Sequence, residues 1–289
     1  MRDFVIMTDS CCDLPAQLAN ELGVVVLPLS VLLGENSFKN YLDGREIGFK
    51  EFYERIRGGA MPTTSAVSVG DFEDAMRSIL AQGKDVLCLN FSAALSTTYQ
   101  SACIAAETMK EEFPEGTVHV LDSACGSLGQ GLLVYLCARK RMDGLDLDGV
   151  FAYAKEIAPR VAHWVTVDDL FHLKRGGRVS AATAVIGSML SIKPIIHIDD
   201  EGRLINVGKA RGRKTSLQTL AEECEKRLLD PSLPVFISHG DCEEDAKIVA
   251  AEVEKRTGAK TMVINYVGPV VGSHTGAGVI ALCFVAKER

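Results

Sequence analysis

The chain has 289 residues, of which 47% are hydrophobic and 24% charged, the composition of a globular protein with one large domain or two smaller ones. Its net charge of −7 argues against non-specific nucleic-acid binding, which needs a basic surface. No apolar run reaches the roughly 18 residues of a membrane span, and the apolar N-terminal stretch is too short for a signal peptide, so we expect a cytoplasmic protein without stable membrane insertion.

The first 160 residues alternate short apolar runs with helical segments. Strands are expected at 4–8, 24–33, 85–90 and 118–121, helices at 15–22, 49–57, 68–82, 98–113, 127–142 and 148–160, and irregular segments at 34–48 and 58–65. Ser68 with Asp71 resembles a capping box at the start of one helix. This alternation is typical of a parallel sheet covered on both faces, which binds ligands at the carboxyl ends of its strands.

The pattern changes near residue 162, where an α+β region begins. Strands are expected at 162–167, 192–198, 203–210, 235–239, 261–267 and 279–285, and helices at 169–174, 181–190, 213–229 and 242–257. Residues 199–202 are expected to form a hairpin turn in which Gly202 supplies a positive φ, and Gly268-Pro269 to turn the chain toward 272–276. The sequence therefore predicts an α/β protein of two domains, residues 1–160 and residues 161–289.

The expected helix 181–190 is apolar all round and built mainly from small residues. Such a helix must be covered on every side, either by protein or by a bound apolar ligand. It follows a basic, glycine-rich turn at 175–178, and Ser180 is placed to cap it. Its candidate residues for lining an apolar cavity are Ala182, Val185, Ile186 and Met189.

The nine cysteines are interpreted as reduced side chains that fill the core. No pair has the CxxC or zinc-ligand spacing, and Cys88 and Cys283, for example, lie in apolar runs. Cys11, Cys12 and Cys125 lie in loops that could face a site, although a buried structural thiol is the favoured interpretation. Neither a metal nor a cofactor is expected.

Three hydroxyl-rich segments, 63–65, 92–98 and 273–275, are the strongest candidates for a site. Each alone could cap a helix, but His274 lies between hydroxyls and glycines, whereas the other five histidines suit packing or surface positions. Two functions stay open: a Ser/His nucleophile pair of an esterase or lipid hydrolase, or a neutral hydrogen-bonding site for a carboxylate at the mouth of an apolar cavity. The GxSxG elbow of many hydrolases is absent.

A third possibility is an enzyme that binds a phosphate ligand through the loops at Asp9 and Asp122. Ordinary capping is favoured for the Asp9-Ser10 loop, because the glycine spacing of a phosphate-binding loop is missing there.

The chain resembles the DegV family. Residues 8–15, TDSCCDLP, resemble its signature TDS-x-x-D-L-P, and later segments resemble further family blocks in the same order. These segments are 62–65, 95–102, 122–123, 173–180 (LKRGGRVS), 193–194 and 268–278.

The resemblance implies an N-terminal Rossmann-like domain and a C-terminal domain with a mixed sheet, with a long-chain fatty acid held non-covalently between them. It implies a lipid-binding accessory protein that is not catalytic alone and that presents the carboxylate to a fatty acid kinase, which makes acyl phosphate for bacterial phospholipid synthesis.

The resemblance also assigns site residues. Thr64 and the loop that carries Ser92 and Ser96 would hold the carboxylate, with His274 nearby. The family loop Ser-Ser-x-Leu-Ser-Gly-Thr reads SAALSTT at 92–98 here, so both serines stay candidates for the contact. The predicted surface for the partner or for phosphate comprises Arg175, Arg178 and Arg211.

Overall fold

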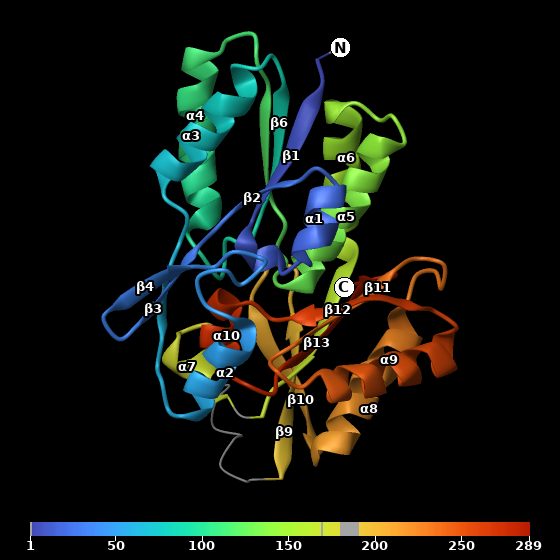
Figure 1. The fold of residues 1–289 in the computed structure, drawn as a ribbon. Coiled ribbons are helices and arrows are strands. Elements are labelled where there is room, and N and C mark those ends of the chain that lie inside the picture. The colour runs from blue at the N-terminus through green and yellow to red at the C-terminus, as the bar shows by residue number, and fades with distance from the viewer. Residues whose placement is uncertain (1, 169, 180–190) are drawn as a thin grey trace.

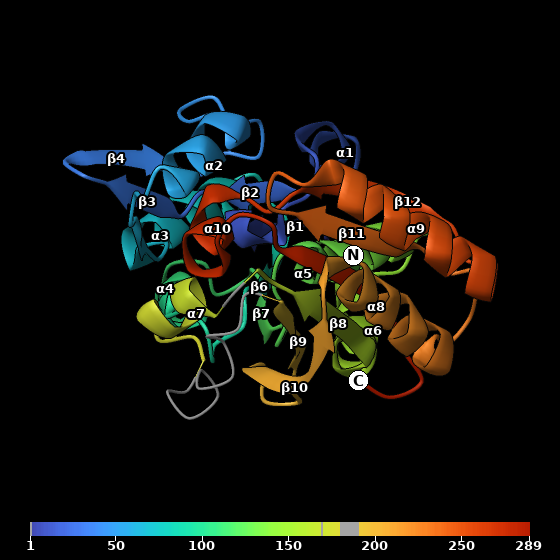
Figure 2. The same ribbon diagram turned by 90° about the horizontal axis from the view of Figure 1, so that it is seen from below.

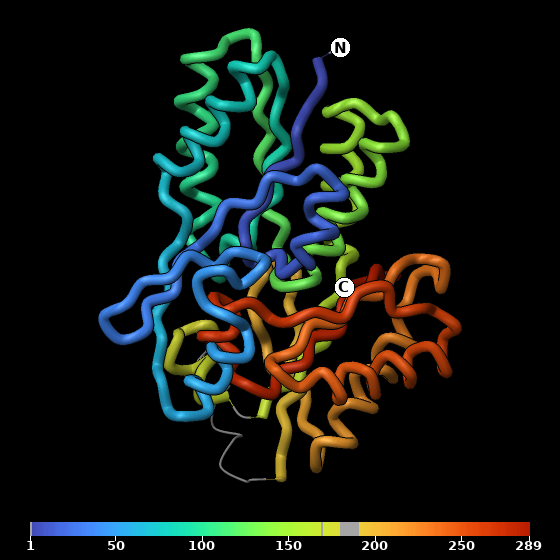
Figure 3. Tube along the Cα trace, in the orientation of Figure 1, coloured from blue at the N-terminus to red at the C-terminus, as the bar shows by residue number. Residues whose placement is uncertain are grey.

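The structure is a computed structural model that describes residues 2–168, 170–179 and 191–289 (Figures 1 and 3). Four parallel strands form the N-terminal sheet, in the order β2-β1-β6-β7. They are β1 (Phe4–Asp9), β2 (Val25–Leu27), β6 (Asp85–Asn90) and β7 (Val118–Asp122). Every residue of β6 is buried, and its alternate side chains enter two different cores because strand side chains point to opposite faces.

Helices cover both faces of this sheet (Figure 1). On one face lie α3 (Val69–Leu80) and α4 (Thr98–Glu112), and on the other lie α1 (Ala16–Glu21), α5 (Leu128–Met142) and α6 (Leu147–Ile157). The predicted capping box is confirmed at the start of α3, where the Ser68 hydroxyl accepts a hydrogen bond of 3.1 Å from the Asp71 N–H.

Six strands form the C-terminal sheet, in the order β10-β9-β8-β13-β11-β12. They are β8 (Val161–Thr166), β9 (Ile192–Ile198), β10 (Leu204–Arg211), β11 (Val235–His239), β12 (Thr261–Tyr266) and β13 (Ile280–Val285). Only β11 and β12 pair in parallel, so the sheet is mixed. The predicted hairpin joins β9 to β10, and Gly202 in its turn has the expected positive φ of 77°.

Helices α8 (Arg213–Arg227) and α9 (Glu243–Thr257) lie side by side against the outer face of the C-terminal sheet (Figure 2). The inner face of this sheet packs on α5, which also packs on the N-terminal sheet, so one hydrophobic core extends across both. The expected fold class, an N-terminal parallel sheet with helices on both faces followed by a mixed sheet, is confirmed.

The sequence prediction was wrong in four segments. The strand expected at 24–33 is two strands, β2 and β3 (Ser30–Leu33), which belong to different sheets; Pro28, which lacks an N–H, lies between them. Segments expected to be irregular contain β4 (Asn36–Lys39) and β5 (Thr63–Ser65), which flank β3 in a small antiparallel sheet. Where Gly268-Pro269 was expected to turn the chain toward 272–276, the helix α10 (Pro269–Thr275) begins.

The remaining elements are α2 (Phe49–Arg57), α7 (Phe171–Arg175) and the short 3₁₀ helices η1 (Ser10–Cys12) and η2 (Ala158–Arg160). The helix expected at 181–190 lies outside the described residues. The nine thiols are free, and all but Cys103 and Cys242 are buried, which confirms the interpretation of cysteine as a packing residue.

Candidate functional site

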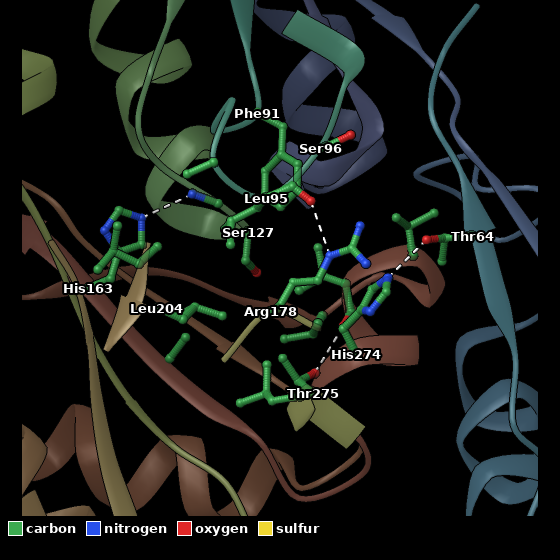
Figure 4. A pocket seen from close by; sticks show the side chains of 18 of the residues that line it. Thr64, Phe91, Leu95, Ser96, Ser127, His163, Arg178, Leu204, His274 and Thr275 are labelled. Carbon is green, nitrogen blue, oxygen red and sulfur yellow. Dashed lines mark hydrogen bonds between the residues drawn. The ribbon is translucent and has the colours of Figure 1, made fainter. Parts of the chain in front are cut away.

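A cavity of about 400 Å³ lies between the N-terminal and C-terminal sheets (Figure 4). The loops that follow β6 and β7 form one side of it, as expected for the carboxyl ends of parallel strands. Strands β8, β9, β10 and β13 and helix α10 supply much of the rest. Its apolar lining includes Leu29, Phe91, Leu95, Val165, Leu173, Ile198, Leu204, Val270, Val279 and Ala281.

One end of the cavity, which we call the anchor end, carries a hydroxyl and an imidazole. Thr64 projects from β5, which is held in register by pairing of Thr64 with Val31, and His274 projects from the last turn of α10. The Thr64 Oγ1 and His274 Nε2 atoms are 2.9 Å apart, although 210 residues separate them in the sequence (Figure 4). The structure therefore brings these two predicted site residues together.

The imidazole at the anchor end is neutral. Burial, and to a smaller extent the positive charges of Arg178 and Arg175, lower the pKa of His274 from 6.5 to about 4. Its Nδ1 is buried without a hydrogen-bond partner among the described residues, and a Cβ on Gly176 would lie 2.2 Å from this atom. The ring is thus fixed against the basic glycine turn, with Nε2 as its polar contact.

Two more predicted residues border the cavity near this end. Ser96 lines it, and its hydroxyl lies 2.9 Å from the hydroxyl of Thr98, at the start of α4. Arg178 also lines it and donates from Nε to the carbonyl oxygen of Leu95 at 3.2 Å, which ties the basic turn to the hydroxyl loop (Figure 4). Ser96, Arg178 and the Thr64–His274 pair therefore lie around one cavity.

The other predicted residues are elsewhere. The Ser92 hydroxyl is buried and donates to the carbonyl oxygen of Gly202 at 2.8 Å, and Ser92 does not line the cavity. Arg175 donates to the carbonyl oxygens of Pro62 and Ser273, so it braces the backbone behind the anchor end. Arg211 is exposed at the end of β10. The candidate lining residues Ala182, Val185, Ile186 and Met189 lie outside the described residues.

The opposite end, which we call the inner end, contains a histidine that sequence reasoning assigned only to surface or packing. His163 is buried, and its Nε2 accepts a hydrogen bond of 3.2 Å from the Gly126 N–H. A Cβ on Gly129 would lie 1.8 Å from the same nitrogen, so glycine there lets α5 approach β8. Burial lowers the pKa of His163 well below its usual value. His163 and Val165 both line the cavity, since alternate residues of a strand face the same side. The two-residue periodicity of 162–167 could therefore have indicated that His163 faces the same space as Val165.

Ser127 also lines the inner end, and its hydroxyl is engaged behind the cavity wall. It donates to Asp13 Oδ2 at 2.6 Å and lies 2.8 Å from the Ser238 hydroxyl. Burial raises the pKa of Asp13 to about 8, although the hydrogen bonds from Ser127 and the Gly268 N–H act in the opposite direction. Asp13 is therefore largely protonated at neutral pH.

The carboxylates of the Asp9 and Asp122 loops are engaged by backbone N–H groups. The Asp9 carboxylate accepts from the N–H groups of Cys11 and Phe91, and the Asp122 carboxylate from those of Ala93 and Ala124. Each carboxylate accepts one hydrogen bond from its own loop and one from the loop after β6, so both tie neighbouring loops together, and Asp9 caps η1 as predicted. Among the described residues, no group of His, Cys, Asp and Glu side chains is arranged to hold a metal ion, and no helix is long and apolar enough to span a membrane.

Comparison with known proteins adds independent information. The family model described as "Uncharacterised protein, DegV family" matches residues 3–287. A DegV domain-containing protein of Clostridium perfringens is 42% identical over 290 residues, which cover 100% of this chain and 99% of the relative.

Two solved structures are similar along the whole chain. A DegV family protein of Thermus thermophilus, described by its fatty acid binding, is 32% identical with a TM-score of 0.84 and 99% and 100% coverage of the two chains. A stearic acid-binding protein of Eubacterium ventriosum is 27% identical with a TM-score of 0.88 and 98% coverage of both.

Proposed function

The chain belongs to the DegV family, and we propose that it binds one long-chain fatty acid non-covalently in the cavity between its two sheets. The observation that carries this proposal is the cavity itself, an apolar space with the Thr64–His274 pair at one end. The relatives that are described as binding fatty acids or stearic acid support the same ligand class. The cavity would lie between two domains, residues 1–160 and residues 161–289.

The free energy of binding would come mainly from the acyl chain. Each buried methylene contributes about 0.8 kcal/mol, so roughly fifteen of them contribute on the order of 10 kcal/mol before the loss of chain freedom is subtracted. The anchor end would hold the carboxylate through Thr64, Ser96 and the neutral His274. Ser92 is not part of this proposal because its hydroxyl donates to Gly202.

A neutral anchor suits a carrier. A buried ion pair would carry a large desolvation penalty, whereas hydroxyl and imidazole donors can satisfy the carboxylate without a direct ion pair, since the guanidinium of Arg178 at this end donates to the carbonyl oxygens of Leu95 and Gly176. The protein then supplies binding and orientation, and the reaction takes place on a partner. We propose that the partner is a fatty acid kinase and that Arg175, Arg178 and Arg211 form the basic surface toward it or toward the transferred phosphate.

A hydrolase remains the second candidate because one observation favours it, the 2.9 Å contact between a hydroxyl and an imidazole. Two features count against it. A general base works best with a pKa near the working pH, and that of His274 is about 4. A catalytic imidazole is also normally oriented by a group on its second nitrogen, and His274 Nδ1 has no hydrogen-bond partner among the described residues.

The two candidates are separated by one set of measurements on the purified chain. The carrier proposal expects native mass spectrometry to find one bound fatty acid, or uptake of palmitate or oleate after delipidation, with no steady hydrolysis of a p-nitrophenyl ester. Hydrolysis that His274→Ala abolishes would favour the hydrolase. A protein that takes up neither acid would contradict the carrier.

The kinase step is tested with the loaded protein, ATP and a fatty acid kinase catalytic protein. Arg178→Ala and Arg211→Ala should slow acyl phosphate formation, whereas Lys255→Ala, an exposed change on α9, should not. If Arg178→Ala and Arg211→Ala both form acyl phosphate at the unaltered rate, the basic surface is misassigned.

A further inference from the structure

We propose that a set of backbone contacts behind the inner end, closed by Arg289 and Ser92, positions the inner wall of the cavity and thereby controls how firmly acyl chains of different length are held. We call this set the clasp and define it as Ser92, Ala124, Asp199, Gly202 and Arg289. The inference rests on the proposed fatty-acid binding and adds to it two positioning residues, Arg289 and Ser92, that do not touch the ligand.

Arg289 makes most of the hydrogen bonds of the clasp. Its guanidinium donates to four carbonyl oxygens: Nε to Val161 at 3.2 Å, Nη1 to Ala124 and Asp199 at 3.1 Å each, and Nη2 to Ala158 at 2.6 Å. Nη2 also lies 3.3 Å from the thiol sulfur of Cys125. No carboxylate of the described residues forms an ion pair with it, so its charge is stabilised by backbone dipoles.

These acceptors come from both sides of the cavity. Ala124 and Cys125 follow β7 of the N-terminal sheet, whereas Asp199 follows β9 of the C-terminal sheet. A planar guanidinium presents five donors in a fixed geometry, so one side chain can fix several loops relative to one another. Figure 3 shows this end of the chain at the level where the two sheets meet.

The β9–β10 turn closes the clasp from the other side. The Ser92 hydroxyl donates to the carbonyl oxygen of Gly202 at 2.8 Å. A Cβ on Gly202 would lie 2.3 Å from Ser92 Oγ and 3.1 Å from Ala124 Cα, so the turn is seated against both strand-end loops. The Asp199 carboxylate accepts from the N–H groups of Glu201 and Arg203, which makes the turn rigid.

The clasp residues adjoin the residues that line the inner end. Phe91 precedes Ser92, Ile198 precedes Asp199, Gly126 comes two residues after Ala124, and Leu204 two after Gly202; all four line the cavity. Any movement of the clasp therefore moves this wall. Thr64 and His274 lie on β5 and α10, outside the clasp, although Ser96 shares its loop with Ser92. Arg289 contacts Ala124 and Asp199 and not this loop, so removing its contacts should affect the methyl end of the acyl chain more than the carboxylate.

This geometry makes a length-dependent prediction. A short acyl chain leaves the inner end unfilled, so its dissociation should not depend on the clasp. A long chain contacts the inner wall, and loosening that wall should release it faster. Arg289→Ala should accelerate dissociation of C16 and C18 acids about tenfold, by about 1.4 kcal/mol, and that of C10 and C12 acids by less than about twofold.

Arg141 offers a matched control. It is also an arginine that donates to backbone carbonyls, those of Leu22 and Phe4, but it lies at the opposite end of the N-terminal sheet from the cavity. Arg141→Ala should remove two hydrogen bonds of the same kind with no length-dependent change in dissociation. Arg289→Lys, which keeps the charge but has fewer donors in a different geometry, should restore only part of the retention of long chains.

The experiment measures dissociation rates of saturated C10 to C18 acids from the delipidated full chain and from these variants. If Arg289→Ala does not fold, Ser92→Ala removes one hydroxyl, which donates to the Gly202 carbonyl oxygen and accepts from the Ala94 N–H, and should show the same length dependence with a smaller amplitude. Equal acceleration at all lengths, or a profile equal to that of Arg141→Ala, would overturn the clasp. Failure of the unaltered chain to bind any of the acids would instead overturn the proposed function.

Discussion

The two ends of the cavity use polar groups in opposite ways. At the anchor end, Thr64 and His274 are neutral side chains that line the cavity themselves. At the inner end, the hydroxyls of Ser127 and Ser92 and the guanidinium of Arg289 are engaged with partners behind the wall. The direction of the ligand can therefore be set by where polar groups are satisfied, because the anchor end presents a hydroxyl and an imidazole together, whereas these hydroxyls and this guanidinium at the inner end already have partners.

The largest expected effect is on the free energy of unfolding, and it comes from replacing Asp13, the hydrogen-bond partner of Ser127 at the inner end. The pKa of this carboxyl is raised from 3.8 to about 8. The unfolded chain loses this proton near pH 4 and the folded chain near pH 8, so the free energy of unfolding falls as pH rises between these values, by up to about 5 kcal/mol.

Asp13→Asn should remove this fall, because an amide does not titrate and Asn also tolerates the positive φ of 50° at this position. Urea unfolding of both proteins at pH 5, 7 and 9 measures the difference, which should grow in favour of the variant as pH rises. A constant difference across this range would show that Asp13 ionises freely in the folded protein.

The next largest effect is on the affinity for long fatty acids, and it comes from filling the apolar part of the cavity with a larger side chain. Ala281 lines the cavity from β13, and Ala281→Phe would place a ring where acyl methylenes would lie. Displacing about five methylenes should weaken binding of C18 acids by about 4 kcal/mol, or about a thousandfold, and should weaken binding of C10 acids far less.

Calorimetric titration with both acids measures this, with Ala250→Phe on the outer helix α9 as the control that leaves the cavity unchanged. Unaltered C18 affinity in Ala281→Phe would place the acyl chain elsewhere.

At the anchor end, His274 gives a pH dependence of the opposite sign. Its folded pKa is lowered to about 4 from 6.5, so the unfolded chain binds the extra proton first as pH falls. Stability present above about pH 6.5 should be lost toward pH 4, by up to about 3 kcal/mol. His274→Gln should be less sensitive to pH than the unaltered protein in that window, as measured by urea unfolding. Parallel curves for the two proteins would contradict a neutral imidazole at the anchor.

The smallest expected effect is the loss of affinity on removing the Thr64 hydroxyl, which tests whether the anchor end contacts the carboxylate alone. Thr64→Val keeps the side-chain shape and removes the hydroxyl. If this hydroxyl donates to the carboxylate, its loss should weaken binding by about 2 kcal/mol, equally for C10 and C18 acids. A loss that depends on chain length would mean that Thr64 contacts the acyl chain and not the head group.

The sequence predicted most helices and strands, and it singled out residues at one of the two ends of the cavity. Alternation of strands and helices before residue 160 identified the parallel sheet, and the hydroxyl segments singled out Thr64 and His274, which the structure brings together. The small sheet of β3, β4 and β5 was missed, because its strands have three or four residues each and are only partly buried, too short to show periodicity.

The clasp behind the inner end could not be predicted, because most of its contacts are made to backbone atoms. Ser92 and Gly202 are 110 residues apart, and Arg289 binds mainly carbonyl oxygens, which every residue carries. No residue type marks such an acceptor in a sequence. The glycines of α5 were visible, but the reason for Gly129, the close approach of His163, depends on the packing of β8.

Helix α5 gives the molecule one more property. Because this helix packs on the N-terminal and C-terminal sheets within the same hydrophobic core, neither half can melt without exposing apolar surface of the other. Heating should therefore produce a single cooperative transition, with the calorimetric and van't Hoff enthalpies in agreement. A lipid would then have to enter and leave through local opening at the surface, since wholesale separation of the halves would amount to denaturation.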